Sequence, residues 1–358
     1  MADSSVLSQA NGEAALTYSL SHMFPAAPQH YGQLNFSVLN NQFFIDLCKG
    51  MGPTTSQDLL FIPTTNYTNL FGLYLWLTTL SAEQCPKVKV FLRWNTTGNM
   101  LMMLSLQLLR GIPSVSFVTD TDYLSRVHQT AGIPNVQVVP IPHSHIPFGD
   151  SVRASDQGLS ALQKTFALRN ARGGIVIGIC GEARIDKGYH LVPEVISRTL
   201  EQTDRVYFLI KTTTKVGGNG DRRNLIDEAT ARLATMPDNV CVIDEPVDEG
   251  TYAALMNLSD VLCLPYLPEN YVGNSSGVFS EAVVLTKPVV VPTGTWMAQE
   301  AAKYGVGHIA AEATPDSISS AILEMANDFA TFKTKSQTAA DAFQRYHSAG
   351  NLLHCLLN

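Results

Sequence analysis

The sequence lacks the features that mark a disulfide-bonded, zinc-binding or membrane-spanning protein. Its six cysteines lie far apart and include no Cys-x-x-Cys pair, so we interpret them as thiols of a reducing compartment. The most apolar stretch, residues 70–80, is too short to span a bilayer. No secretory signal is recognisable in the polar segment 1–13. These absences favour a cytoplasmic location and leave open a peripheral contact with a membrane.

Charged residues are also scarce. They make up 15% of the chain, against 45% hydrophobic residues, and the formal net charge is −7. An acidic chain lacks the general electrostatic attraction for nucleic acids, and the high hydrophobic fraction argues against disorder. A length of 358 residues is enough for two ordinary domains. We therefore expect a two-domain globular protein that does not bind nucleic acid.

Two series of alternating strand-like and helix-like segments follow one another along the chain. In the first, the apolar runs 58–63, 87–92 and 114–119 alternate with helical patterns, and the second runs from the buried segment 174–180 to the segment 288–291. The other predicted elements include a first strand at 15–20 and helices at 155–169, 249–258, 316–335 and 343–357. Such alternation predicts parallel sheets covered by helices on both faces. The predicted fold class is α/β, with two doubly wound Rossmann-like domains. Ligands of such sheets bind at the carboxyl ends of the strands.

A Pro-rich run at residues 140–149 separates the two series. The predicted organisation has four parts: a disordered tail over 1–14, an N-terminal domain over 15–168, a C-terminal domain over 169–338 and a final segment over 339–358.

The first candidate site is the segment Gly-Glu-Ala-Arg-Ile-Asp-Lys-Gly at residues 181–188, directly after a predicted strand. Glycines at both of its ends permit a tight strand-to-helix turn, from which Arg184 and Lys187 project. Two cations at the carboxyl end of a strand suit a diphosphate. The alternative is a solvated turn that carries two surface cations.

The second candidate site lies at residues 271–282, where small polar residues precede an apolar helix. Asn274, Ser275 and Ser276 can present N–H and hydroxyl groups at the helix N-terminus, which attracts anions because its first N–H groups lack helical partners. Glu281 lies about one turn inside this helix, where it can accept hydrogen bonds from ribose hydroxyls. The alternative is an N-cap followed by a surface glutamate. Since both segments follow strands of one parallel sheet, we expect them at the same edge.

Three segments resemble the donor-binding domain of GT-B glycosyltransferases, most closely the retaining enzymes of glycosyltransferase family 4: GEARIDKG, SDVLCLPY and NSSGVFSEAVVLTKPVVVPTGTW. The resemblance covers residues 174–307. It implies a GT-B fold, with the two domains facing each other across a cleft. It also implies a retaining, hexosyltransferase-like enzyme that transfers a sugar from a nucleoside diphosphate sugar to the hydroxyl of a glycan, a lipid-linked sugar or another glycoconjugate. We expect no cofactor, and no metal ion, because the second half has no Asp-x-Asp-like carboxylate pair.

The resemblance implies roles for individual residues. Lys187 matches the lysine that binds the donor diphosphate, and Arg184 matches the accompanying arginine, although it lies nearer to the lysine than is usual in the family. Glu281 matches the second glutamate of the family's E-x7-E motif, which holds the ribose, whereas Gly273 stands where the first glutamate would be. The other implied donor contacts are those of Asn274, Ser275, Ser276, Gly277, Tyr266 and Tyr271 with the diphosphate and sugar, and those of Asp244, Glu245, Pro246 and Tyr252 with the base.

The resemblance assigns the acceptor to the N-terminal domain. Family members often carry a histidine near residues 119–122 that contacts the donor sugar, but this chain reads Thr-Asp-Thr-Asp there. Asp120 is the candidate catalytic substitute, with Asp122 as its alternative, and an N-cap role for either is equally consistent. GT-B enzymes also return to their first domain with a last helix, which we expect for residues 339–358.

Two other functions stay open. A GT-B nucleotide-sugar epimerase would need carboxylates and histidines around the donor as acid and base, but the predicted donor domain holds only His190 and His308. A non-catalytic relative that binds a nucleotide sugar or a glycan is compatible with the missing glutamate at Gly273. Turnover of a donor distinguishes an enzyme from such a binding protein.

Overall fold

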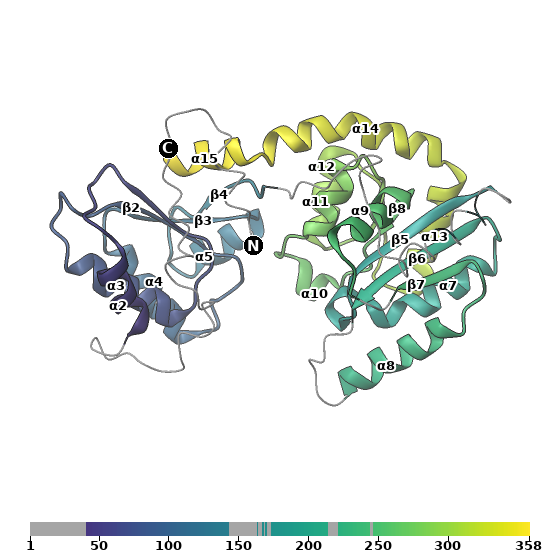
Figure 1. Ribbon diagram of the computed structural model, residues 1–358, viewed down its shortest axis with the longest axis horizontal. Helices are drawn as coiled ribbons and strands as arrows, with labels where there is room; N and C mark the ends of the chain where they lie inside the picture. The colour runs from purple at the N-terminus through teal and green to yellow at the C-terminus, as the bar shows by residue number, and fades with distance from the viewer. Residues whose placement is uncertain are drawn as a thin grey trace. The chain divides into compact units, whose positions relative to one another are not determined.

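The chain consists of two compact units, shown in the computed structural model of Figure 1. Unit 1 comprises Met1–Pro142 and His347–Asn358, and unit 2 comprises His143–Tyr346. The structure describes residues 41–142, 163, 167, 169, 173–213, 221–243 and 246–358. The predicted tail, the predicted first strand at 15–20 and most of the helix predicted at 155–169 lie outside these ranges.

Unit 1 is built on a sheet of four parallel strands in the order β1-β2-β3-β4. The strands are β1 (Leu59–Ile62), β2 (Lys87–Phe91), β3 (Val115–Thr119) and β4 (Gln137–Val138). The helices are α2 (Gln42–Gly50), α3 (Tyr67–Thr78), α4 (Met100–Arg110), α5 (Asp122–Thr130) and α15 (Ala349–Leu357).

The helices that follow the first three strands of unit 1 begin at side-chain caps. Asn66, Asn99 and Thr121 each accept a hydrogen bond from the backbone N–H three residues ahead, at the starts of α3, α4 and α5. Such a cap satisfies one of the N–H groups that lack a partner in the first turn. Thr121 is therefore the N-cap of α5, and the N-cap role considered for Asp120 and Asp122 is wrong.

Both faces of the unit 1 sheet are covered. On one face, Leu60 and Val88 pack with residues of α2, α3 and α4, including the fully buried Leu73. On the other face, Leu356 of α15 packs against Phe91 and Val118. The last helix of the chain thus completes the core of unit 1.

Unit 2 is built on a sheet of six parallel strands in the order β10-β9-β8-β5-β6-β7. The strands are β5 (Ile175–Glu182), β6 (Val206–Thr213), β7 (Val240–Ile243), β8 (Val261–Cys263), β9 (Val289–Pro292) and β10 (His308–Ala310). The chain fills one half of this sheet from β5 to β7 and then returns to pair β8 with the other edge of β5. This is the doubly wound order, whose direction reverses between β5 and β8.

Helices cover both faces of the unit 2 sheet (Figure 1). Ile177 and Phe208 pack with residues of α7, α8 and α13. Gly178 faces the other way, towards the end of α9, and a Cβ added there would overlap the side chain of Ser259. The described helical elements are η3 (Ile185–Lys187), η4 (Tyr189–Leu191), α7 (Val192–Leu200), α8 (Asp221–Ala234), α9 (Glu249–Leu258), α10 (Pro268–Tyr271), α11 (Gly277–Val284), α12 (Trp296–Tyr304), α13 (Pro315–Asn327) and α14 (Phe329–Tyr346).

Most of the predicted helices and strands are confirmed, and the α/β fold class is confirmed by the two parallel sheets. The helix predicted at 316–335 is wrong as a single element, because the chain breaks at Asp328 between α13 and α14. The helix predicted at 343–357 is likewise two helices, since Ser348 caps the start of α15. The short elements β10 and α10 were not predicted.

The bounds of the units differ from those predicted for the domains. Unit 2 begins at His143 rather than at residue 169, and the chain returns to unit 1 at His347 rather than at 339. The second difference has a clear cause, because α14 continues in unit 2 to Tyr346 and buries Phe343 against Phe279 and Tyr304. No helix in the described ranges is both long and apolar enough to cross a membrane. None of the six cysteines, all of which lie within the described ranges, forms a disulfide.

Candidate functional site

The loops that follow β5 and β8 meet where the strand order of unit 2 reverses. The N–H of Leu267, after β8, donates a hydrogen bond of 3.0 Å to the carbonyl oxygen of Asp186, after β5. Gly188, at the end of the first loop, has a φ of 70° and packs closely against the second loop. A Cβ at this position would overlap the carbonyl oxygen of Pro265. The crevice at such a reversal is the usual ligand site of an open α/β sheet. The predicted cationic loop therefore lies where a ligand is expected.

A pocket of about 290 Å³ opens at this point, and we call it the β5–β8 pocket. Its walls come from the loop after β5, from α9, and from the segment between β8 and the first turns of α11. It is lined by Arg184, Lys187, Tyr252, Tyr266, Tyr271, Ser275, Ser276, Gly277, Val278 and Glu281. All of these except Val278 were predicted as donor contacts. Unit 2 thus brings together, by itself, most of the residues that the sequence singled out.

The remaining predicted residues do not line this pocket. Asn274, within the described range 246–358, is not part of the lining, and its amide donates to the carbonyl of Asn270 at 2.6 Å. Pro246 is exposed, and Asp244 and Glu245 lie outside the described residues. Asp120 belongs to unit 1, where it follows β3 and is buried, with 6% of its surface exposed.

Arg184 lines the pocket while two carboxylates hold its guanidinium. Asp186 accepts a hydrogen bond from Nε at 2.9 Å and also pairs with the second terminal nitrogen, and Glu182 pairs with the first terminal nitrogen at 3.3 Å. The main cause of the raised pKa of Arg184 is its hydrogen bonding to Asp186. Asp186 and Glu182, both within the described range 173–213, are not part of the lining. The carboxylates therefore hold the guanidinium from outside the pocket.

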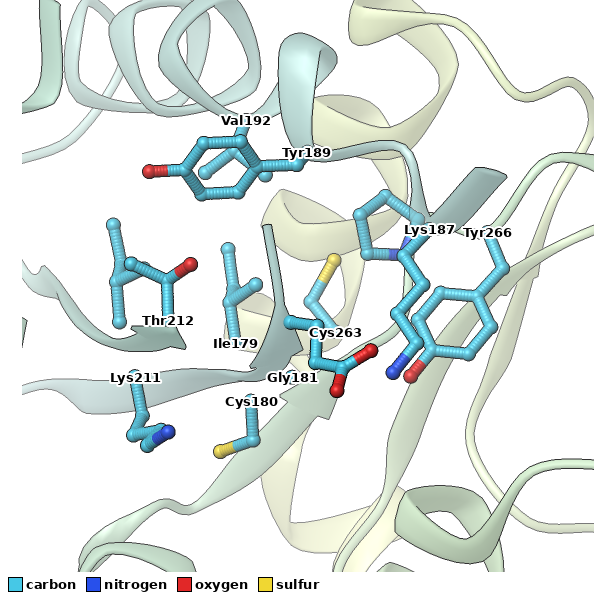
Figure 2. A pocket seen from close by; sticks show the side chains of 13 residues that line it. Ile179, Cys180, Gly181, Lys187, Tyr189, Val192, Lys211, Thr212, Cys263 and Tyr266 are labelled. Atoms are coloured by element: carbon cyan, nitrogen blue, oxygen red, sulfur yellow. The ribbon is translucent and has the colours of Figure 1, made fainter. Parts of the chain in front are cut away.

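Lys187 lies beside a pair of tyrosines. Its Nζ is 5.7 Å from the ring centroid of Tyr266, and the ring centroids of Tyr266 and Tyr271 are 4.5 Å apart. Figure 2 shows the ammonium group of Lys187 beside the Tyr266 ring. Burial raises the pKa of Tyr271 to about 12, and it also raises the pKa of Tyr266. Both phenols therefore stay protonated at neutral pH and can donate hydrogen bonds.

The N-terminus of α11 forms another wall of the pocket. Ser276 is the N-cap and accepts a hydrogen bond from the N–H of Phe279 at 3.3 Å, while Gly277 and Val278 supply the first two N–H groups of the helix. These groups have no acceptor within the helix and lie at its positive end. Together with the cations of Arg184 and Lys187 they make an environment suited to a phosphate group.

A hydrogen bond joins two more pocket residues from different helices. The hydroxyl of Tyr252, on α9, donates to Oε2 of Glu281, on α11, at 2.6 Å. Burial raises the pKa of Glu281, and the bond from Tyr252 acts in the opposite direction. The pKa of Tyr252 is raised mainly by burial, and also by the nearby carboxylate of Glu281. The sequence analysis named both residues but gave no sign that they touch.

A narrower cavity shares Lys187 and Tyr266 with the β5–β8 pocket and lies over the ends of β5 and β6. Figure 2 shows Lys211 and Cys180 at one side of it and Lys187 at the other. Burial lowers the pKa of Lys211, against the opposing influence of Cys180 and Glu182. The sequence analysis missed Lys211. A lysine near the carboxyl end of β6, the strand that pairs with the first described strand of unit 2, could have been recognised as a candidate site residue. Within the described parts of the chain, no three His, Cys, Asp or Glu side chains form a candidate metal site.

No model of a known protein family and no curated protein matches the sequence. Solved structures do match it. Anabaena HepE, in complex with UDP-glucose, has a TM-score of 0.60 and 15% identity over 84% of this chain and 77% of its own. The UDP-forming α,α-trehalose-phosphate synthase of Burkholderia vietnamiensis has a TM-score of 0.62 and 13% identity over 89% of this chain and 77% of its own.

A third similar structure is a trehalose-6-phosphate synthase studied for glycosyl transfer with retention. It has a TM-score of 0.66 and 11% identity over 95% of this chain and 83% of its own. At these identities the likeness establishes the fold, which is the GT-B fold of these glycosyltransferases, as predicted.

Proposed function

We propose that the protein is a glycosyltransferase that takes a sugar from a nucleoside diphosphate sugar and transfers it to an acceptor hydroxyl. The observation that carries this proposal is the composition of the β5–β8 pocket, which combines two cations, a helix N-terminus and a carboxylate at the reversal of the strand order. The cations and the helix suit a diphosphate. The carboxylate of Glu281 suits the hydroxyls of a ribose.

The same groups account for the chemistry. As the bond between the sugar and the diphosphate breaks, negative charge grows on the leaving phosphate. Lys187, Arg184 and the first N–H groups of α11 are fixed in place to stabilise that charge, which is the task that a metal ion performs elsewhere. We therefore propose a reaction without a metal ion. From the spacing of the cysteines we also propose a reducing compartment, such as the cytoplasm.

The retaining outcome and family 4 membership are also part of the proposal. They are supported by the sequence resemblance of residues 174–307 and by the similar synthase studied for transfer with retention. We propose that the acceptor, a glycan, a lipid-linked sugar or another glycoconjugate, binds unit 1, where Asp120 at the end of β3 is the candidate contact.

UDP and UDP-glucose are the first ligands to test, because one similar protein binds UDP-glucose and another is UDP-forming. A ligand that binds the folded state raises the melting temperature by mass action. We expect one nucleoside diphosphate among UDP, ADP and GDP to raise the melting temperature of the full chain, and the corresponding nucleotide sugar to be turned over. Stabilisation by none of them would remove the basis of the proposal.

A binding protein without catalytic activity is the second candidate. The specific observation in its favour is Gly273, a buried glycine where the resemblance calls for a glutamate. A non-catalytic binding protein would bind the nucleotide but would release no nucleoside diphosphate from any sugar donor. The epimerase alternative has less support, because His190 and His308, both in the described part of unit 2, are not among the residues that line the β5–β8 pocket.

A further inference from the structure

The contact between Tyr252 and Glu281 links α9 and α11, which are separated along the chain by β8 and α10. The donor–acceptor distance of 2.6 Å is typical of a hydroxyl that donates to an ionised carboxylate. Both side chains are half-buried, and both line the β5–β8 pocket. The bond is therefore part of the pocket wall rather than of the solvent-exposed surface.

The direction of this hydrogen bond is fixed by chemistry. An ionised carboxylate can only accept, so the phenol of Tyr252 must donate. Because burial raises the pKa of Tyr252 well above its ordinary value, the phenol keeps its proton at neutral pH. Tyr252 occupies Oε2 of Glu281 and thereby fixes the rotation of the carboxylate, while Oε1 keeps its capacity to accept from a ligand.

Two described groups interact with the carboxylate of Glu281. Tyr252 donates a hydrogen bond to it from α9. On β5, burial in the main and also the Glu281 carboxylate raise the pKa of the Cys180 thiol, which Lys211 of β6 acts to lower. Among the described groups that influence its pKa, Tyr252 is the one that favours the charged form, against the effect of burial. Removing the hydroxyl of Tyr252 would therefore leave the carboxylate both less fixed and easier to protonate.

We propose that Tyr252 is a positioning residue, which holds the carboxylate of Glu281 so that it accepts hydrogen bonds from the ribose hydroxyls of a nucleoside diphosphate and makes the pocket selective for ribonucleotides. This inference rests on the proposed function, because it assumes that a nucleoside diphosphate binds in the pocket. It assigns Tyr252 a different task from the contact with the base that the sequence resemblance implied.

The test compares two ligands that differ only in the ribose hydroxyls, UDP and 2′,3′-dideoxy-UDP, by titration calorimetry on the full chain. A charge-assisted hydrogen bond to a hydroxyl corresponds to about tenfold in affinity or more, so we expect wild type to prefer UDP by at least about that factor. In Tyr252→Phe this preference falls by about 3- to 10-fold, while the affinity for dideoxy-UDP stays within about twofold. If UDP is not the nucleotide that binds, the matching pair of ADP or GDP analogues is used.

Two further variants separate positioning from a purely structural role. Glu281→Gln abolishes most of the preference, and adding Tyr252→Phe to it causes little further loss, because the two residues act as a unit. Tyr304→Phe, in a tyrosine of α12 outside the pocket lining, leaves the preference unchanged. If Tyr252→Phe does not fold, Tyr252→Met fills the space without a hydroxyl.

The pH dependence gives an independent measurement. Protonation of Glu281 removes an acceptor for the ribose, so the preference for UDP falls as the pH falls through the raised pKa of this carboxyl. In Tyr252→Phe the pKa of the Glu281 carboxyl rises further, so the preference for UDP falls at a higher pH than in wild type.

The outcomes distinguish this inference from the proposed function. If wild type binds UDP and dideoxy-UDP equally, or if Tyr252→Phe weakens both to the same extent, the inference is wrong and nucleotide binding stands. If wild type binds no nucleoside diphosphate, both are wrong. A preference that falls in Tyr252→Phe and survives in Tyr304→Phe supports the assignment.

Discussion

The carboxylate of Asp186 holds the guanidinium of Arg184 within a single turn of the chain. It accepts from Nε at 2.9 Å and pairs with a terminal nitrogen as well. The carbonyl oxygen of the same aspartate accepts from the N–H of Leu267 at 3.0 Å. Asp186 therefore ties the position of Arg184 to the loop after β8, the strand on the other side of the reversal.

The first prediction follows from this pairing. Because Asp186 holds Arg184 from outside the pocket, Asp186→Asn leaves the arginine less well oriented towards a phosphate. We expect the affinity for the nucleoside diphosphate to fall by about 3- to 10-fold, since charge-assisted pairs contribute on this scale. Arg184→Ala combined with Asp186→Asn should bind no more weakly than Arg184→Ala alone, as measured by calorimetry.

The matched control is Asp227→Asn, which breaks the Arg223–Asp227 pair on α8, away from the pocket. This variant is expected to bind as wild type does. Tighter binding by Asp186→Asn would contradict the prediction, because it would mean that Asp186 competes with the phosphate for Arg184.

The second prediction concerns Lys187. If its ammonium stabilises charge that grows on the leaving diphosphate, it contributes more in the transition state than in the ground state. Lys187→Ala is then expected to lower kcat by about 10²- to 10³-fold, with a smaller change in the donor KM. Arg184→Ala is expected to act in the same direction but more weakly. Steady-state kinetics on variants shown by circular dichroism to be folded provides the measurement.

Lys333→Ala serves as its control, because Lys333 is an exposed lysine of α14 outside the pocket lining. It is expected to keep the wild-type kcat. If Lys187→Ala does the same, the segment 181–188 is a solvated turn, and the catalytic role proposed for it is wrong.

The third prediction is that donor turnover does not need a divalent metal ion. The positive groups of the pocket, Lys187, Arg184 and the N-terminus of α11, provide the stabilisation for which other enzymes use a metal. Rates of transfer or of donor hydrolysis are expected to be equal with and without EDTA. Activity that disappears in EDTA and returns with Mn²⁺ would be evidence against this mechanism.

The fourth prediction tests the backbone that shapes the pocket. Gly188 has a φ of 70°, in the left-handed region, and lies against the carbonyl of Pro265. A non-glycine residue in this conformation costs about 1–3 kcal/mol, and the overlap of its Cβ with Pro265 adds to that cost. Gly188→Ala is therefore expected to lower both the free energy of unfolding and the affinity for nucleotide, as measured by urea denaturation and calorimetry.

Gly98→Ala is the comparison for this variant. A Cβ at Gly98 meets nothing within 4 Å, and its backbone is not in the left-handed region. We expect Gly98→Ala to leave stability unchanged. Equal stability of the two variants would show that the loops after β5 and β8 can separate at little cost.

The fifth prediction concerns the last helix. Leu356 is buried, with 5% of its surface exposed, against Phe91 and Val118 of unit 1, whereas its neighbour Leu357 is 54% exposed. Leu356→Ala is expected to cost about 2–5 kcal/mol of stability, the range for buried leucines, and Leu357→Ala close to nothing. Thermal unfolding of the two variants checks this, and equal melting temperatures would mean that α15 does not complete the core of unit 1.

The sequence by itself determined the succession of elements, because the signals involved are local. Apolar runs of four to eight residues mark buried strands, and the segment predicted as a helix at 249–258 is α9, Glu249–Leu258. Caps and glycines are local as well, which is why the two phosphate-site segments could be recognised. The break at Asp328 was missed because apolar residues keep a helical spacing across it, at Met325, Phe329 and Phe332. The break after Tyr346 does carry a local signal, the cap residue Ser348, which the sequence analysis overlooked.

Only the tertiary structure decided which of the predicted residues touch one another around the β5–β8 pocket. The return of β8 to the free edge of β5 depends on which apolar faces can be buried together, and no local pattern records that choice. This return brings Leu267 to Asp186. It also sets α9 and α11 so that Tyr252 meets Glu281, a contact between residues 29 positions apart. A hydrogen bond between side chains of two helices depends on how both pack against the sheet, and so it follows from the fold rather than from the spacing of the residues.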